Sequence, residues 1–345
     1  REWSSNGLSG LFAWRRNLAR FEFLGMLTDI LRFSLRARSD LVRNRIGSTP
    51  LDEYLAGCRI GEAFRSNYLL PMGSAIWSTP TAKLLQFPAQ SFLRFFDNHR
   101  LLHLSRPKWR SVAGGSQCYV QRVAADLGQR VRLNCPVLGV TRIYDGVMVE
   151  MPDGKQLFDA VVLAGHSDQI LRALRNPSQE QTQILSALRY GDNTAYLHRD
   201  ESLMPKRRAA WGAWNYMRSA ESNRVCVSYW MNPLQQLRAD KPVFVTLNPE
   251  TPPDPSKVFA KIAYAHPLFD HAALAAQRRI HRIQGQGGVW LAGAWMGYGF
   301  HEDGIVSGLR VAHALGADIP WSPDFERSSS VESEATSEQD ALEAA

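Results

Sequence analysis

The sequence lacks several features that would place it in a common class of protein. No stretch of about 20 uncharged apolar residues occurs, so it predicts no membrane-spanning helix. No short apolar segment follows a basic start, which argues against a secretory signal peptide. Its four cysteines, Cys58, Cys118, Cys135 and Cys226, have no C-x-x-C spacing, so neither a zinc site nor a disulfide framework is expected. These absences predict a cytoplasmic protein with reduced thiols and no metal.

Apolar content and charge define the broad class. The chain has 345 residues, 45% of them hydrophobic, and ten tryptophans. This length and composition support one large or two ordinary domains with hydrophobic cores. Charge is uneven, because the last 24 residues, 322–345, hold seven acidic residues against Arg327, while the whole chain carries +7. This acidic tail has few large apolar side chains, so we predict that it is disordered.

Residues 11–46 have the spacing of one or two basic helices. Leu24, Leu27, Leu31 and Leu35 recur every three or four residues, and arginines occupy polar positions between them. Such a surface suits an anionic membrane, which would place the protein peripherally at the inner face of the membrane. An amphipathic helix with a solvated arginine face explains the same pattern and is the simpler interpretation. No nucleic-acid motif accompanies the basic residues, so no nucleic-acid partner is expected.

The pattern along the chain changes from helical to strand-like. Residues 59–105 are mostly helical in pattern, and a glycine pair, Gly114-Gly115, precedes a further helix. A turn at Pro152-Asp153-Gly154 predicts a hairpin, and the apolar run 159–164 predicts a buried parallel strand. Alternation through residues 193–265 predicts a mainly antiparallel sheet. The fold class is therefore α/β, or α+β when the whole chain is considered.

The segment 289–316 carries the main chemical signal. An apolar strand, 289–292, leads into a loop with three glycines and then into a helix predicted from about Gly304 to Leu315. The first N–H groups of a helix have no intrahelical partner and its N-terminus is partly positive. Such a helix start therefore suits a phosphate or the electron-rich edge of a flavin. The spacing alone fits a tight connection in an ordinary sheet equally well.

A resemblance to a known family favours the flavin interpretation. The stretch Gly293–Gly304, GAWMGYGFHEDG, resembles the C-terminal flavin motif of the amine-oxidase, phytoene-desaturase and protoporphyrinogen-oxidase superfamily. More closely, it resembles a bacterial subgroup of NAD/FAD-binding oxidoreductases similar to the flavoprotein-like N-terminal part of plant cyclopropane fatty-acid synthases. The resemblance covers about residues 5–320. Its other matching stretches are YLLPMGSAIW (68–77), FLRFFDNH (92–99), AGHSDQ (164–169), AWNY (213–216), VTLN (245–248) and AHP (265–267).

The resemblance implies FAD as the cofactor and a set of residues that bind it. These residues are Gly114, Gly115, Val137, Ala164, Gly165, Gly293, Ala294, Glu302, Asp303, Gly304 and Ile305. The glycine pair at 114–115 matches one that opens a helix of the flavin domain, and the backbone of Val137 matches the position that meets the adenine. The segment from Glu302 to Ile305 matches the helix start under the flavin ring. Ala294 stands where the family usually has an acid that contacts the ribityl chain, so this sequence lacks that carboxylate.

The opening segment of the superfamily is not found in this sequence. That segment comprises a strand, a G-x-G-x-x-G turn and a helix, which together hold the pyrophosphate of the cofactor. No such turn lies near Arg1, and Asn6–Gly10 has the wrong spacing for one. We therefore expect an incomplete Rossmann-like FAD-binding domain in a truncated chain. Weak or no retention of FAD, and no activity, are expected of this chain alone.

The resemblance also implies two domains that alternate along the chain. Residues 1–106 are expected to form the helical part of a substrate domain, and residues 177–284 its sheet. Residues 107–176 and 285–321 are expected to form the middle and C-terminal segments of the FAD-binding domain. The disordered acidic tail, 322–345, completes this plan.

The implied function is that of an FAD-dependent oxidoreductase. It would oxidise or isomerise an apolar substrate, such as a fatty-acyl lipid, by hydride transfer to the flavin. His301 is the candidate catalytic residue, because an imidazole near the flavin can move a proton near neutral pH. A capping or loop-bonding role for His301 is the alternative. Two other functions fit: a flavin amine oxidase, and a non-catalytic or fragmentary flavin-fold protein acting as a partner subunit.

A group of aromatic residues in the predicted sheet has two interpretations. They line an apolar substrate cavity or they belong to the core. The group comprises Trp211, Trp214, Tyr216, Tyr229 and Trp230.

Overall fold

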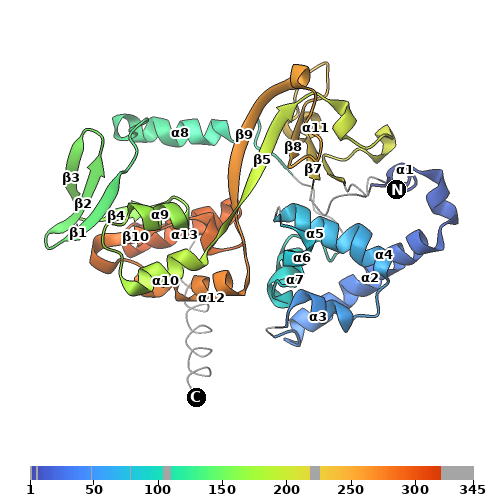
Figure 1. Cartoon of the computed structure of the whole chain (residues 1–345), viewed down its shortest axis with the longest axis horizontal. Coiled ribbons are helices and arrows are strands. Elements are labelled where there is room, and N and C mark those ends of the chain that lie inside the picture. Colours follow the sequence, from blue (N-terminus) through green and yellow to red (C-terminus); the bar gives the residue numbers. More distant parts are fainter. Residues whose placement is uncertain are drawn as a thin grey trace. The chain divides into compact units, whose positions relative to one another are not determined.

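The structure, a computed structural model, describes residues 2–4, 7–47, 49–77, 79–103, 110–217 and 226–319. The chain forms two compact units, each built from two separate segments (Figure 1). The first unit comprises Arg1–Val131 and Tyr190–Asp270, and the second comprises Arg132–Arg189 and His271–Ala345. The acidic tail, 322–345, for which we predict disorder, lies outside the described residues.

The N-terminal segment of the first unit is helical. Its helices are α1 (Gly7–Leu11), α2 (Phe21–Val42), α3 (Leu51–Ala56), α4 (Glu62–Phe64), α5 (Leu70–Ile76), α6 (Thr81–Leu84), α7 (Ala89–Asn98) and α8 (Gln117–Leu127). Prolines precede α3, α6 and α7, where a missing N–H costs no intrahelical bond. Aromatic side chains hold these helices together: the ring centroid of Trp77 lies 4.7 Å from that of Phe95 and 5.6 Å from that of Phe92. The helical pattern predicted for residues 59–105 is confirmed over the described residues 59–77 and 79–103, and residues 78, 104 and 105 lie outside them.

The second segment of the first unit forms a five-stranded sheet in the order β6-β7-β8-β5-β9. Its strands are β5 (Tyr190–His198), β6 (Trp214–Met217), β7 (Cys226–Trp230), β8 (Phe244–Leu247) and β9 (Val258–Pro267), with the short helix α11 (Met231–Gln235) after β7. Each neighbouring pair is antiparallel, and β5 and β9 form the long ribbon visible in Figure 1. The predicted antiparallel sheet is therefore confirmed.

A directed chain of hydrogen bonds lies inside this sheet. The backbone N–H of Asp200 donates to Nδ1 of His198 at 3.0 Å, so the imidazole proton is on Nε2. That proton is donated to the hydroxyl of Thr246 at 2.7 Å, and Thr246 lies 2.7 Å from the hydroxyl of Ser228. Ser228 in turn donates to the carbonyl of Leu203 at 2.9 Å. Because the three side chains from β5, β7 and β8 are 0% exposed, the chain satisfies polar groups that water cannot reach.

The buried histidine predicts a loss of stability below about pH 6.5. Burial lowers the pKa of His198 below its ordinary 6.5 and outweighs the opposing effect of the Asp200 carboxylate. Between pH 6.5 and the lowered pKa of His198, this imidazole is protonated in the unfolded chain and neutral in the folded chain. The free energy of unfolding then decreases by up to about 1 kcal/mol per pH unit. Urea unfolding of the wild type and of His198→Gln at about pH 7.5 and about pH 5.5 measures the effect. The variant should lose less stability on acidification, and equal losses would show that His198 does not carry it.

The second unit combines three strands of one sheet with two of another. An antiparallel sheet contains β1 (Gly139–Ile143), β2 (Gly146–Met151) and β3 (Gly154–Phe158), while β4 (Val161–Leu163) pairs in parallel with β10 (Val289–Leu291). The predicted hairpin at residues 152–154 joins β2 to β3. The helices of the second unit are α9 (Ser167–Ala173), α10 (Gln179–Ala187), α12 (His271–Arg279) and α13 (His301–Ala314).

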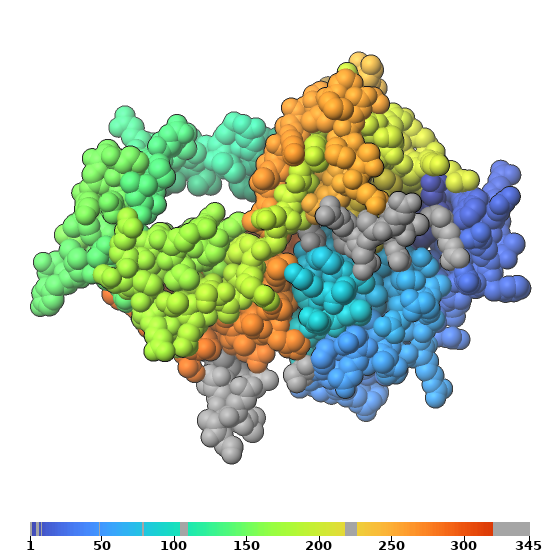
Figure 2. Space-filling model, viewed as in Figure 1, coloured from blue at the N-terminus to red at the C-terminus, as the bar shows by residue number. Residues whose placement is uncertain are grey.

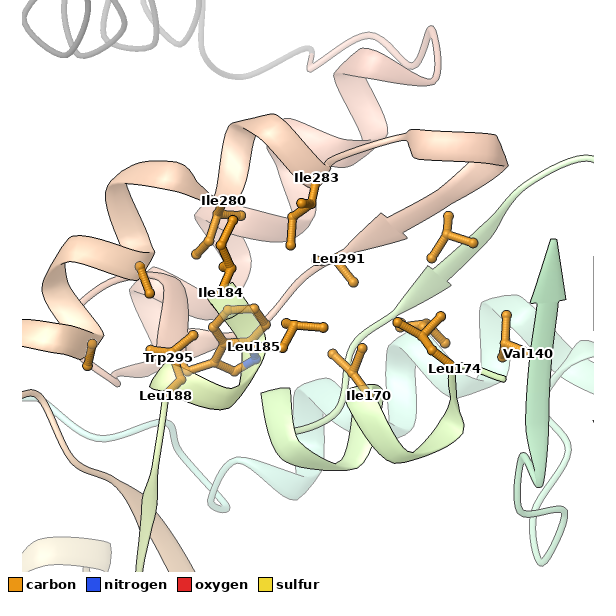
Figure 3. Packing of buried hydrophobic residues seen from close by; sticks show 14 of the residues in the cluster. Val140, Ile170, Leu174, Ile184, Leu185, Leu188, Ile280, Ile283, Leu291 and Trp295 are labelled. Carbon is orange, nitrogen blue, oxygen red and sulfur yellow. The ribbon is translucent and has the colours of Figure 1, made fainter. Parts of the chain in front are cut away.

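One apolar cluster forms the core of the second unit (Figure 3). Leu163 of β4 and Leu291 of β10 meet Ile170 of α9, Ile184 of α10 and Ile280 after α12. Leu163 and Leu291 therefore bury one side of the parallel pair against helices, while Val162 is 44% exposed, so the strand predicted to be buried is buried on one face only. The mixture of helices and sheets confirms the predicted fold class. None of the described helices is long and apolar enough to cross a membrane.

Candidate functional site

The candidate site is built on the edge where the two parallel strands end. The register pairs Leu163 with Leu291, and the N–H of Ala292 donates to the carbonyl of Leu163 at 3.0 Å. The two chain segments therefore leave the sheet side by side. They are Ala164-Gly165 after β4 and Gly293-Ala294 after β10. Ligands of α/β proteins bind at the carboxyl ends of parallel strands. The structure thus brings together four predicted residues from two distant parts of the sequence.

A buried tryptophan ties these two strand ends to each other. The indole Nε1 of Trp295 donates to the carbonyl of Gly165 at 3.0 Å, and the side chain is only 3% exposed. The ring lies so close to Gly293 that a Cβ built there would come within 2.4 Å of Nε1. Trp295 lies within the stretch Gly293–Gly304 that resembles the flavin motif. The structure places it in the core, where it holds the loop.

A glutamine of the neighbouring helix fixes the same loop and was missed by sequence reasoning. The amide Nε2 of Gln277, on α12, lies 2.7 Å from the carbonyl oxygens of Trp295 and of Gly297 and donates to both. Gln277 belongs to a helical segment with no motif, so no local signal could have identified it. Its bonds satisfy two loop carbonyls that a Gly-rich turn would otherwise leave to water.

The helix that follows begins at His301, three residues before the predicted start at Gly304. The reason is local: the carboxylate of Asp303 accepts the N–H of Phe300 at 2.9 Å and so caps the first turn. Ser307 adds a link back to the strand, since its Oγ accepts the N–H of Gly293 at 2.9 Å and donates to the carbonyl of Gly304 at 2.7 Å. The start of α13 is therefore tied to the end of β10.

The predicted residues of the second unit differ in exposure. Ala164, Gly165, His301, Glu302 and Ile305 are exposed. Others are half-buried, including Gly304, where an added Cβ would lie 3.8 Å from the Cβ of Ala294. Val137 is exposed too and lies just before β1, outside the strands.

The glycine pair lies in the first unit and opens α8. Gly114 and Gly115 have φ values of +78° and +82°, a left-handed conformation that favours glycine. A Cβ on Gly114 would also approach Sγ of Cys118 to 2.6 Å. The helix that they open has no buried residue, and its blue-green atoms lie on the surface in Figure 2. The glycines are thus required by backbone geometry, whichever ligand they meet.

The edge formed by Gly165, Ala294 and the start of α13 fits the ring end of a flavin. The first turn of a helix leaves N–H groups without intrahelical partners and carries a partial positive charge. Both suit the electron-rich edge of the ring. Small side chains at Ala294 and Gly304 leave room for a flat group to approach. Ala294 offers no carboxylate to a ribityl chain, so any hold on that chain must come from elsewhere.

Comparisons with solved structures agree with this architecture. The fold is similar to that of a fatty acid isomerase from P. acnes that produces CLA, with 14% identity, 86% of this chain and 76% of that chain covered, and a TM-score of 0.57. It is also similar to wild-type putrescine oxidase, with 14% identity, 84% and 75% covered, and a TM-score of 0.61. A third similar fold is cyclohexylamine oxidase from Brevibacterium oxydans, with 12% identity, 78% and 68% covered, and a TM-score of 0.53. No curated protein matches the sequence.

The sequence itself matches a family described as flavin containing amine oxidoreductase. The match runs from residue 16 to residue 232 and so covers the helical segment, the glycine pair, β1–β4 and most of the sheet. The predicted superfamily is thereby confirmed, while the finer likeness to cyclopropane fatty-acid synthases stays a prediction. Because the match spans more than half of the chain, this protein belongs to the flavin-containing amine oxidoreductase family, and FAD is its cofactor.

Proposed function

We propose that this protein is an FAD-dependent oxidoreductase that oxidises or isomerises an apolar, fatty-acyl substrate. The observation that carries the proposal is the edge at Gly165, Gly293-Ala294 and the start of α13, which fits the ring end of a flavin. When bound there, FAD supplies the hydride acceptor. The same fold in a fatty acid isomerase supports a lipid-like substrate.

The residues of this chain would position the cofactor rather than perform the redox step. The N–H groups at the start of α13 would hold the electron-rich edge of the ring, and Gly165, Ala294 and Gly304 would leave space beside it. Trp295, Gln277 and Ser307 would keep the loop in place, because their hydrogen bonds join β4, α12 and α13 to it. His301 is exposed as the first residue of α13, a place from which it would exchange a proton with the substrate.

The aromatic residues singled out in the predicted sheet divide into two groups. Trp211 is core, since it is 7% exposed and packs edge-on against Trp230 and Phe244. The half-buried side chains of Trp214 and Tyr229 pack beside Val227 and face α5. We propose that this second group, with Tyr216, lines the space for an apolar substrate.

A flavin amine oxidase is the second candidate function. It is favoured by the similar folds of putrescine oxidase and cyclohexylamine oxidase, whose names specify amine substrates. At this level of identity the likeness concerns the fold, so the two candidates must be separated by substrate.

The test uses the protein expressed from its natural gene. Bound FAD should give absorption bands near roughly 370 and roughly 450 nm, and these should bleach under anaerobic conditions when the substrate is added. Unsaturated fatty acids and their acyl esters form one panel, and primary amines the other. We expect bleaching, or isomerised product without net bleaching, with the fatty-acyl panel. Bleaching by amines alone would support the second candidate, and a folded colourless protein would overturn both.

A matched pair of variants tests the role of His301. His301→Gln should slow turnover by at least about tenfold, because an amide cannot take up and release a proton as an imidazole does. His281→Gln changes an exposed histidine of a short helical turn after α12 and should leave turnover unchanged. If both variants retain the wild-type rate and pH profile, His301 has no catalytic role.

A further inference from the structure

Helix α2, with 22 residues, is packed through one face only. Its inward face contributes Phe23, Met26, Phe33 and Ala37 to the core, and each of them is at most 4% exposed. Phe33 meets Phe64 of α4 with ring centroids 5.1 Å apart. This face supplies the apolar packing that attaches α2 to the first unit.

The opposite side of α2 carries a second row of apolar side chains, which we name the outer stripe. The stripe consists of Phe21, Leu24, Leu31, Leu35 and Val42. Their spacing of three, four or seven residues places them on one side of a helix. Their exposed fractions run from 39% for Leu24 to 90% for Phe21. Single exposed apolar residues are ordinary, but a row of five along one side of one helix is typical of a surface that meets something apolar.

Arginines border the outer stripe on both sides. At 100° per residue, Arg38 falls on one edge of the stripe, while Arg32 and Arg43 fall on the other. Arg32 and Arg38 approach acids only loosely, at 3.7 Å from Asp29 and 3.8 Å from Asp97. Both arginines are well exposed, so these contacts leave their charges available to a second partner.

Of the three acidic residues of α2, Glu22 falls on the side of the helix opposite the stripe at 100° per residue, and Asp29 and Asp40 are already engaged. Asp29 is 8% exposed and accepts the N–H of Gly61 at 2.8 Å. Asp40 accepts the hydroxyl of Tyr54 at 3.0 Å and pairs with Arg36 at 3.4 Å. The outer surface of α2 is therefore apolar along its middle and cationic along its borders.

We propose that the outer stripe is a docking surface for an anionic membrane, on which α2 lies parallel to the lipid plane. Apolar side chains would enter the boundary between headgroups and acyl chains, and the bordering arginines would meet anionic headgroups. A second copy of this chain is the less suitable occupant. Two stripes placed face to face would bring arginine borders against arginine borders, and like charges in contact repel. This surface is independent of the reaction proposed above, so either proposal can fail without the other.

Binding of the purified full chain to vesicles tests the proposal. Vesicles of phosphatidylcholine are compared with vesicles that contain about one-third phosphatidylglycerol. Co-sedimentation should be at least about tenfold stronger with the anionic vesicles and should weaken as salt is added. Leu31→Gln/Leu35→Gln should reduce binding by on the order of tenfold, because two side chains of the stripe lose their apolar contact. Arg32→Gln/Arg43→Gln should reduce binding to anionic vesicles by about tenfold.

Two variants on other exposed surfaces of the first unit serve as controls. Phe259→Gln removes a side chain of β9 that is 59% exposed, and Arg238→Gln removes one charge from an exposed loop. Both should bind vesicles as the wild type does, and circular dichroism should show all variants folded, since the changed residues are exposed. Equal binding to both vesicle types, or an unchanged stripe variant, would overturn the proposal. So would a dimer in sedimentation velocity that the stripe variant dissociates.

Discussion

Gly293→Ala is expected to lower the free energy of unfolding by about 2 to 3 kcal/mol. The added Cβ would lie 2.4 Å from Nε1 and 2.6 Å from Cδ1 of Trp295, far inside normal contact. The ring cannot move aside freely, because it is 3% exposed and donates a hydrogen bond to the carbonyl of Gly165. Relief of the clash must therefore shift the ring, the loop or the strand end. Urea unfolding followed by circular dichroism measures the loss.

The same substitution should weaken the hold on FAD, because the loop that it displaces forms the candidate site. Gly308→Ala is a matched control in the same segment. An added Cβ at Gly308 would have nothing within 4 Å, and alanine favours a helix over glycine by about 1 kcal/mol. The control should therefore be as stable as the wild type or more stable, with unchanged flavin content. Similar stability of the two variants would show that Trp295 yields easily and does not hold the loop.

His198→Ala is expected to lower the free energy of unfolding by about 3 kcal/mol. The substitution removes the donor to the hydroxyl of Thr246 and the acceptor for the N–H of Asp200. Both losses occur inside a sheet where the histidine is 0% exposed. It also opens a space beside Phe244, whose ring centroid lies 5.5 Å from that of the imidazole. Thermal and urea unfolding should agree on the size of the loss.

A histidine at the surface provides the comparison for His198. His281→Ala removes an exposed imidazole after α12, and such surface changes usually alter stability by no more than about 0.5 kcal/mol. His198→Gln should be intermediate, because its amide retains a donor but does not match the imidazole geometry. A loss below about 1 kcal/mol for His198→Ala would contradict the argument, since it would mean that the buried partners find water or each other.

Local pattern predicted much of the fold, because the hydrophobic periodicity that marks a strand or a helix extends over only a few residues. The turn at residues 152–154 joins β2 and β3 as predicted, and the glycine pair at 114–115 precedes α8. Where a local bond competes with periodicity, the prediction was less accurate. α13 begins at His301 because Asp303 caps Phe300, a contact that the glycine pattern does not reveal. Within the span predicted as a sheet, 193–265, residues 208–210 form a 3-10 turn, and β6 begins only at Trp214.

The candidate site was predicted only in part. The resemblance to the flavin superfamily pointed to Ala164-Gly165 and Gly293-Ala294, which follow two apolar strands. The parts that hold this edge together were not predictable. The bond from Trp295 to Gly165 joins residues 130 positions apart, and Gln277 reaches the loop from another helix. Nothing in the local sequence distinguishes such residues from ordinary core or surface positions.

Helix α2 separates what the sequence determines from what the tertiary structure decides. The sequence by itself determined that residues 11–46 contain amphipathic, arginine-rich helix, because periodicity and propensity act within a few turns. It suggested Leu24, Leu27, Leu31 and Leu35 as the apolar face. Only the tertiary structure decided that the neighbouring row, which includes Phe33, packs inward and that Leu24, Leu31 and Leu35 face out. The ring of Phe33 packs against Tyr54 of α3 and Phe64 of α4, and close packing of this kind depends on the shape of partners distant in sequence.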